Sequence, residues 1–368
     1  MRYITGLGET VTPVAPPEGV IPGVRLIHAP SLWRAGIDGT GVTVGIVDTG
    51  ADASHPALQG AILGGRNFTG GIVLPPDPDA WQDRQGHGTH VAVIIRQVAP
   101  GARLLIAKGL DDQGAGSDAG LAAAIDWLRL QGVDIISASW GGAEASEELH
   151  TAVRMAVAAG ILFCAAAGNE GHLPDIDSVM YPARWDEPLA VAATMQMVPG
   201  IEGTLPADYS SAGPEVDVAA PGTWITSAAP GGGWVELSGT SMATPMVAGF
   251  AALLAHWWLR ATGRMPTEPE LVTLLLSHTR DIAGAGRDVL SGVGQIDASP
   301  LSVRHVVELT DGSPEALVDG EPVVLDVPAR IEAGRFLVPF RAEGEALGAA
   351  VSWEPGPPVR GRAEIETV

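Results

Sequence analysis

The chain has 368 residues, of which 46% are hydrophobic, and a formal net charge of −22 at pH 7. That length allows one large core, or a large domain joined to a small one. The acid excess excludes nucleic-acid binding as the main function, because few cationic side chains remain to neutralise phosphates. The excess of acidic residues favours solubility and the binding of cations, but it identifies no partner.

Cysteine content and apolar runs indicate in which cellular compartment the protein is found. Cys164 is the only cysteine, so no internal disulfide is expected, and its apolar run at 161–165 favours a buried side chain over a reactive thiol. Residues 1–20 hold one arginine and no continuous apolar run, unlike a secretory signal. No apolar run approaches the length of a membrane span. These features predict a cytoplasmic protein without a membrane span.

The order of predicted elements indicates an α/β fold. Residues 1–23, rich in proline and glycine, are expected to form an extended arm. After it, strands are expected at 42–47, 103–107, 133–139 and 160–165, and helices at 87–98, 120–130 (capped by Asp118), 147–159 and from 241 to 261. This alternation predicts right-handed crossovers and a mostly parallel sheet between helices. In such sheets functional groups gather beyond the carboxyl ends of the strands.

A composition change near residue 301 predicts a second module. The segment 305–368 is acidic and short-stranded and lacks the alanine-rich helices. We therefore expect an arm over 1–23, a large α/β domain over 24–300 and a small β-rich α+β module over 305–368.

Four polar residues stand at predicted strand or helix ends: Asp48, His87, Asn169 and Ser241. Each has an ordinary structural interpretation, as a turn former or a helix cap. His87 and His90 also have a spacing that metal ligands use, but no HExxH pattern or third ligand accompanies them. No metal site is predicted from these residues.

In the order Asp, His, Asn, Ser, these residues resemble the catalytic motifs of the subtilisin-like serine proteases. The matching segments are IVDTG at Asp48, HGTHVA at His87, AAAGNEG at Asn169 and GTSMATP at Ser241. The likeness covers about 24–300 and is strongest to the intracellular subtilisins, on segments such as 29–33 (APSLW) and 64–69 (GGRNFT). It implies a three-layer α/β fold with a mostly parallel sheet between helices.

The resemblance implies a serine endopeptidase that works through an acyl-enzyme. Ser241 is expected to attack a peptide carbonyl, His87 to carry its proton and Asp48 to orient His87. The Asn169 side chain and the Ser241 N–H are expected to hold the oxyanion. Protein or peptide substrates would bind as an added strand, with broad specificity. The alternative is a non-catalytic protein of this fold that acts as a binding module or scaffold through its C-terminal module.

The resemblance alone assigns further residues to substrate binding. The residues expected to pair with the substrate backbone are Gly114, Ala115 and Gly116 on one side, and Ser139, Trp140 and Gly141 on the other. Leu110, Leu121 and Trp140 are expected to line an apolar pocket several residues before the scissile bond, with core packing as the alternative. Met180 stands where relatives commonly have glycine or serine, so cleavage after small or medium apolar residues is expected.

The same comparison bears on calcium. The glycine-rich loop that wraps a tight calcium ion in relatives is missing before Val98, and Ala57 replaces the aspartate that often follows Ser-His-Pro. We therefore expect no required cofactor and no tight calcium site. A weaker cation site elsewhere in the chain, favoured by its many acidic residues, stays an open alternative.

The C-terminal segment resembles the small stalk domain first noted at the N-terminus of copper amine oxidases. The matching segments include 317–320 (LVDG) and 334–339 (GRFLVP). This domain is expected to carry no copper ligands. Its usual setting is extracellular, so secretion or cell-surface display is the alternative to a cytoplasmic location. Whether the arm covers the active site, and whether the chain forms a homodimer, stay open.

Overall fold

The computed structural model divides the chain into two compact units, residues 1–298 and 299–368. In the first unit and at residue 299 it describes 3–4, by backbone alone, and 12–17, 19–70, 80–171, 177–196 and 203–299. In the second unit it describes the backbone of seven strands.

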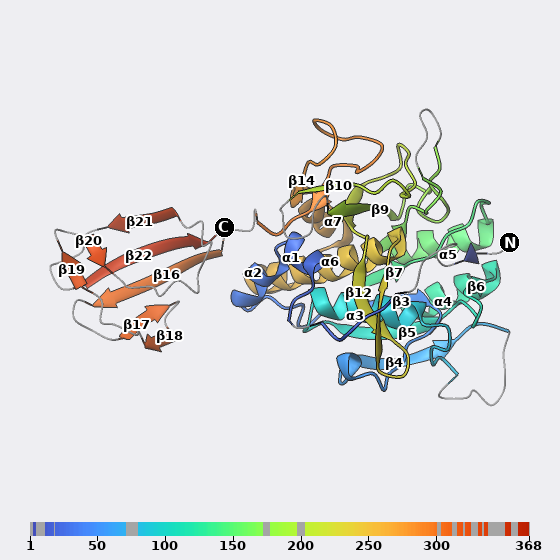
Figure 1. The fold of residues 1–368 in the computed structure, drawn as a ribbon, viewed down its shortest axis with the longest axis horizontal. Coiled ribbons are helices and arrows are strands. Elements are labelled where there is room, and N and C mark those ends of the chain that lie inside the picture. The colour runs from blue at the N-terminus through green and yellow to red at the C-terminus, as the bar shows by residue number, and fades with distance from the viewer. Residues whose placement is uncertain are drawn as a thin grey trace. The chain divides into compact units, whose positions relative to one another are not determined.

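A ten-stranded sheet forms the centre of the first unit (Figure 1). Its order is β14-β15-β11-β9-β8-β7-β3-β5-β4, with β10 paired to β9. Seven pairings are parallel, and only β14–β15 and β10–β9 are antiparallel, as the alternating pattern predicts. The strands are β3 (Thr43–Asp48), β4 (Ile62–Asn67), β5 (Arg103–Lys108), β7 (Ile135–Ala138), β8 (Leu162–Ala166), β9 (Leu189–Gln196), β10 (Thr204–Pro206), β11 (Val218–Pro221), β14 (Thr279–Arg280) and β15 (Gln295–Ile296).

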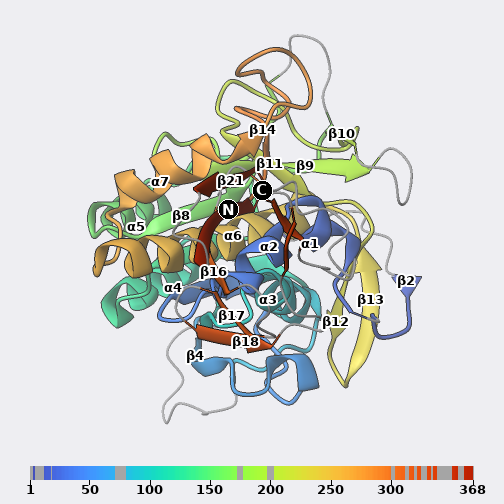
Figure 2. The same cartoon turned by 90° about the vertical axis from the view of Figure 1, so that its left-hand side faces the viewer.

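Helices cover both faces of this sheet (Figure 2). The helices α4 and α5 enclose the apolar core on one face, while α3 and α6 pack together on the other. The helices are α1 (Pro22–Leu26), α2 (Ala29–Arg34), α3 (His87–Val98), α4 (Asp118–Gln131), α5 (Glu147–Ala158), α6 (Thr240–Thr262) and α7 (Glu268–Ser277), with a short 3-10 turn η1 at Pro56–Leu58. The predicted three-layer α/β architecture is confirmed.

Helix α6 is the central helix of the unit. In the part of the chain that the structure describes, it alone is long and apolar enough to cross a membrane, but 83% of its most apolar stretch is buried. Gly249 lets it approach α3 closely, because a side chain there would begin 2.8 Å from the Val98 side chain. It is therefore a core helix.

Two small sheets lie beside the central one. The hairpin β12 (Ile225–Ala229) and β13 (Gly233–Leu237) takes the arm segment β2 (Thr12–Pro13) as a third strand. The arm segment β1 (Tyr3–Ile4) pairs antiparallel with β6 (Ala115–Gly116), Tyr3 opposite Gly116 and Ile4 opposite Ala115. The extended arm therefore supplies two strands to the first unit.

The second unit is all β-strand in its described part. Five antiparallel strands follow in the order β18-β17-β16-β22-β21, and β19 and β20 form a separate pair. The strands are β16 (Val303–Thr310), β17 (Glu315–Val318), β18 (Glu321–Val324), β19 (Arg330–Glu332), β20 (Arg335–Leu337), β21 (Ala350–Glu354) and β22 (Arg360–Thr367).

Local details confirm one expectation and correct another. Cys164 is buried in β8, and burial raises the pKa of its thiol, so the interpretation as a buried small side chain is confirmed. Asp118 does not cap α4: Ser117 is the N-cap, and its hydroxyl accepts the Gly120 N–H at 3.2 Å. Serine and aspartate are both good N-cap residues, and the helix begins one residue earlier than a cap at Asp118 would require.

Candidate active site

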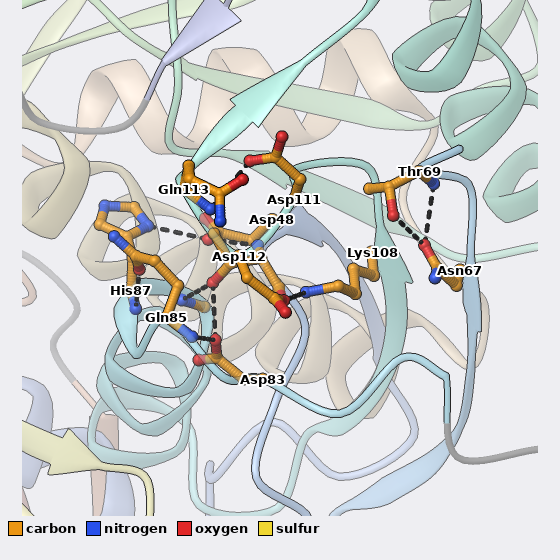
Figure 3. A network of polar contacts seen from close by, with 12 residues as sticks. Asp48, Asn67, Thr69, Asp83, Gln85, His87, Lys108, Asp111, Asp112 and Gln113 are labelled. Atoms are coloured by element: carbon orange, nitrogen blue, oxygen red, sulfur yellow. Dashed lines mark hydrogen bonds and ion pairs between the residues drawn. The ribbon is translucent and has the colours of Figure 1, made fainter.

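Asp48 and His87 are brought together by the ends of two elements. Asp48 is the last residue of β3, and His87 is the first residue of α3. His87 Nδ1 lies 2.8 Å from Asp48 Oδ1, and both side chains are buried (Figure 3). Because a carboxylate can only accept, Nδ1 carries the proton and Nε2 is the basic nitrogen.

Glycine after His87 makes this contact possible. A side chain at Gly88 would begin 2.1 Å from the Gly50 carbonyl oxygen and 3.1 Å from Asp48 Oδ1. Any larger residue would therefore push the start of α3 away from the end of β3. The glycine in the HGTHVA segment is explained by close packing of α3 against the loop after Asp48.

Ser241 stands in the first turn of α6 and is 3% exposed. Its N–H is one of the first N–H groups of the helix, which have no acceptor within the helix. The N-cap is Gly239, which has no side chain of its own to cap the helix. Thr240 and Ser241 lie inside the helix, so the alternative interpretation of Ser241 as the helix cap does not hold.

Asn169 follows β8 and faces the start of α6. Its Oδ1 accepts the Thr240 N–H at 2.9 Å and the Thr240 hydroxyl at 3.1 Å. The Thr240 hydroxyl in turn accepts the Gly168 N–H at 3.2 Å. These bonds assign the amide oxygen to Thr240, so the amide NH2 of Asn169 is turned to the other side, where it can donate.

A model of the subtilase family matches residues 39–294 of this sequence. The chain belongs to the subtilase family. It is a serine peptidase, as the resemblance implied.

Three curated subtilases illustrate the similarity. The "Intracellular serine protease" of Paenibacillus polymyxa is 43% identical over 267 residues, which cover 70% of this chain and 79% of that protein. The "Major intracellular serine protease" of Bacillus subtilis (strain 168) is 38% identical over 307 residues, 78% of this chain and 92% of that one. "Subtilisin E" of the same strain is 40% identical over 241 residues, 63% of this chain but only 60% of that protein.

The second unit also has a family match. A model of the copper amine oxidase N-terminal domain matches residues 302–358. The resemblance of this segment to the stalk domain is thereby confirmed.

The expected substrate edge of this subtilase is the strand β6. Gly114 precedes it, and Ala115 and Gly116 form it; their backbone pairs with β1 of the arm. A side chain at Gly116 would begin 2.7 Å from Leu110 and 3.1 Å from Leu121. Both leucines therefore lie directly beneath the strand and are fully buried there, and the pocket and core interpretations both stand.

The opposite edge, expected at 139–141, follows β7. Ser139 is buried against Ser241, and its hydroxyl donates to the Ser241 carbonyl at 2.9 Å. Trp140 is 1% exposed and donates its indole N–H to the Val47 carbonyl at 2.9 Å. The tryptophan therefore ties this segment to β3, the strand that carries Asp48.

Met180 fills the space between two glycines of the site. A side chain at Gly141 would begin 3.0 Å from Met180 Cβ, and one at Gly168 would begin 3.0 Å from Met180 Cγ. The Met180 N–H donates to the Ala167 carbonyl at 2.8 Å. Its side chain thus lies between the 139–141 segment and the loop that carries Asn169.

His90 is part of the core. It is fully buried, and its Nε2 lies 3.1 Å from the Ile225 carbonyl oxygen. Burial, reinforced by the neighbouring His87, lowers the pKa of His90 to about 3. Among the residues that the structure describes, no group of three or more His, Cys, Asp or Glu side chains is placed to hold a metal ion.

Helix α3 runs without interruption from His87 to Val98, and β5 begins at Arg103. There is no room between them for a long inserted loop. The calcium loop that the sequence comparison found missing therefore has no counterpart in the backbone of this segment. The consequence for calcium dependence stays a prediction.

Sequence reasoning missed three residues at the site: Thr49, Asp83 and Lys108. All three are buried polar residues that are linked by hydrogen bonds next to the Asp48–His87 pair. Figure 3 labels Asp83 and Lys108 beside that pair. One signal was present in the sequence. An aspartate stands four residues before a helix whose own N-cap is glycine, and such a helix start needs an acceptor from elsewhere.

Proposed function

We propose that this subtilase is a serine endopeptidase that cleaves extended polypeptides through an acyl-enzyme on Ser241. The observation that carries the proposal is the 2.8 Å hydrogen bond between His87 Nδ1 and Asp48 Oδ1. It fixes the tautomer in which His87 Nε2 can accept a proton. Ser241 supplies the nucleophile from the first turn of α6, which packs against α3.

The chemistry begins when Ser241 Oγ attacks the substrate carbonyl carbon. At rest, the Ser241 hydroxyl donates to the Ser139 carbonyl at 3.3 Å. During attack the proton passes from Oγ to His87 Nε2, and Asp48 stabilises the imidazolium. The same proton then goes to the leaving amine, and water releases the acyl group by the reverse path.

The oxyanion receives two donors. One is the Ser241 N–H at the positive end of α6, and the other is the Asn169 amide NH2. The hydrogen bonds from Thr240 to Asn169 Oδ1 hold the amide in the orientation that this role needs. Loss of one such donor costs about 10²–10³ in turnover in comparable enzymes.

Substrate residues before the scissile bond would pair with β6, because the arm shows that this edge accepts an antiparallel strand. Binding through main-chain hydrogen bonds supports broad specificity. The residue next to the scissile bond would meet Met180, whose side chain already fills the gap between Gly141 and Gly168. We therefore propose a preference for small to medium apolar residues at that position.

Activity is proposed to be independent of a tightly held calcium ion. The uninterrupted α3 and the alanine at 57 support this, because neither supplies the usual loop or carboxylate. Incubation with EDTA should leave peptidase activity unchanged. A rapid loss that calcium restores would overturn this part of the proposal.

The proposed location is the cytoplasm, where protein substrates would be encountered. Two curated relatives are named intracellular serine proteases, and they cover 70% and 78% of this chain. Cell fractionation with an antibody against the chain tests this, since recovery in the culture medium would favour secretion.

The catalytic proposal is tested by labelling with a fluorophosphonate probe, which reacts only with an activated serine. Wild type should be labelled, and Ser241→Ala should not be, although both should give the same circular dichroism spectrum. A folded wild type without labelling would favour the non-catalytic scaffold. Ser137→Ala, another buried serine near the site, serves as the control that should keep labelling.

A further inference from the structure

Asp83 is a buried carboxylate outside the proposed triad, only 6% exposed. Its Oδ1 accepts the Thr49 hydroxyl at 3.0 Å, the Gln85 N–H at 3.0 Å and the Gly86 N–H at 2.8 Å. Asp83 Oδ2 accepts the Thr89 N–H at 2.8 Å and the Thr89 hydroxyl at 2.6 Å. All five partners are donors, so the group is placed as a carboxylate that only accepts.

Asp83 replaces the cap that α3 lacks. Gly86 is the N-cap of α3, has φ 112° and offers no side chain. Asp83 satisfies the N–H groups of Gly86 and Thr89 instead and places negative charge at the positive end of α3. The first residue of that helix is His87, so the cap fixes the backbone position from which the His87 side chain extends.

Thr49 connects this cap to Asp48. The Thr49 hydroxyl donates to Asp83 and accepts the Gly88 N–H at 2.9 Å, while the Thr49 N–H donates to Asp48 Oδ1 at 2.7 Å. The Thr49 carbonyl accepts a hydrogen bond from the Lys108 ammonium at 2.5 Å. Lys108 also binds Asp112, as Figure 3 shows. One threonine thus joins the end of β3 to the start of α3.

We propose that Asp83 is a positioning residue that acts through Thr49 to hold His87 in register with Asp48. This inference rests on the proposed triad. It has two physical parts. The hydrogen bonds fix the imidazole relative to Asp48, and a misplacement of about 1 Å can cost about 100-fold in rate. The Asp83 charge favours the imidazolium that forms when Ser241 reacts.

Other ionisable groups of the described residues also lie near His87 or the residues that support it. Asp48 ends β3, His90 lies on the next turn of α3, Lys108 ends β5, and Asp112 pairs with Lys108. None of them contacts the N–H groups at the start of α3 as Asp83 does. Loss of the Asp83 charge should therefore destabilise the His87 imidazolium and slow the step in which Ser241 reacts.

The test compares Thr49→Val with Thr49→Ser. Valine keeps the shape of threonine but removes the hydroxyl that bridges Asp83 and Gly88; serine keeps the hydroxyl. We expect Thr49→Val to lower kcat by about 10- to 100-fold with KM changed by less than about threefold. Thr49→Ser should retain most of the activity. Asp83→Asn should resemble Thr49→Val and, because it also removes the charge, should lower kcat at least as much.

Rates are expressed per folded molecule, with the folded fraction taken from circular dichroism. If Thr49→Val keeps wild-type kcat, Asp83 only stabilises the fold and the proposal is wrong. If Asp83→Asn does not fold, the Thr49 pair decides alone. Fluorophosphonate labelling of wild type distinguishes failure of the proposed triad from failure of the Asp83 proposal, because an unlabelled wild type would refute the triad itself.

Discussion

Ser139 and Ser241 exchange two hydrogen bonds where β7 meets α6. The Ser139 hydroxyl donates to the Ser241 carbonyl at 2.9 Å, and the Ser241 hydroxyl donates to the Ser139 carbonyl at 3.3 Å. The first bond has a specific cause. Pro245 lies four residues after Ser241 within the helix and has no N–H to offer its carbonyl. Ser139 satisfies that carbonyl and anchors the nucleophile to the sheet.

Ser139→Ala should therefore destabilise the protein and slow acylation. The Ser241 carbonyl would be buried without its donor, which costs about 1–3 kcal/mol. Urea unfolding in a Ser241→Ala background, where self-digestion cannot occur, measures the stability, and fluorophosphonate labelling of the otherwise wild-type enzyme measures reactivity. Ser137→Ala is the matched control, because the Ser137 hydroxyl is buried without a hydrogen-bond partner among the described residues. Equal stability losses for the two variants would contradict the assignment.

Met180→Gly should open the pocket before the scissile bond. Removal of the side chain between Gly141 and Gly168 leaves room for an aromatic ring, and each added group in an apolar pocket is worth about 10- to 200-fold in selectivity. The ratio of kcat/KM for phenylalanine over alanine substrates should rise by at least about tenfold. Met155→Ala, at an exposed methionine on α5, should leave the ratio unchanged. A wild-type preference for large aromatics would refute the role of Met180.

A variant that lacks residues 1–11 should bind peptide substrates more tightly. Tyr3 and Ile4 pair with the same strand, β6, that we expect substrates to use, so arm and substrate compete. KM should fall by about tenfold, since a tethered strand has a high effective concentration. A synthetic peptide of residues 1–11 should inhibit the shortened enzyme competitively, and a scrambled peptide should not. Unchanged KM would show that the β1–β6 pairing does not limit access.

Acid should destabilise the fold through His90. Burial lowers the pKa of His90 to about 3 from 6.5, so folding favours the neutral ring. The stabilising contribution is complete above pH 6.5 and is lost as pH falls from 6.5 toward 3. Within that window the loss is about 1.4 kcal/mol per pH unit. Burial also lowers the pKa of His256.

His90→Gln tests this, because its amide can still donate to the Ile225 carbonyl. Urea unfolding at several pH values should give a shallower decline of stability for the variant, by about 1.4 kcal/mol per unit. A variant whose decline below pH 6.5 parallels that of wild type would exclude His90 as the acid-sensitive group.

Several features of the site were predictable because they are encoded in short segments. The apolar run at 42–47 predicted β3, and the strand runs 43–48 with Asp48 at its end. The helix predicted at 87–98 has those bounds, which puts His87 at its start. The predicted cap Asp118 was wrong, because composition near a helix start does not specify which backbone position begins the helix.

The sequence by itself determined the family and the α/β architecture, and it singled out four polar residues, each in a short motif at the end of an element. Only the tertiary structure decided how they are held. Asp83 reaches Thr49 across 34 positions, Ser139 reaches Ser241 across 102, and the arm contact joins residues 3–4 to residues 115–116. Contacts of that kind follow from how strands and helices stack, and no local periodicity in the chain records them.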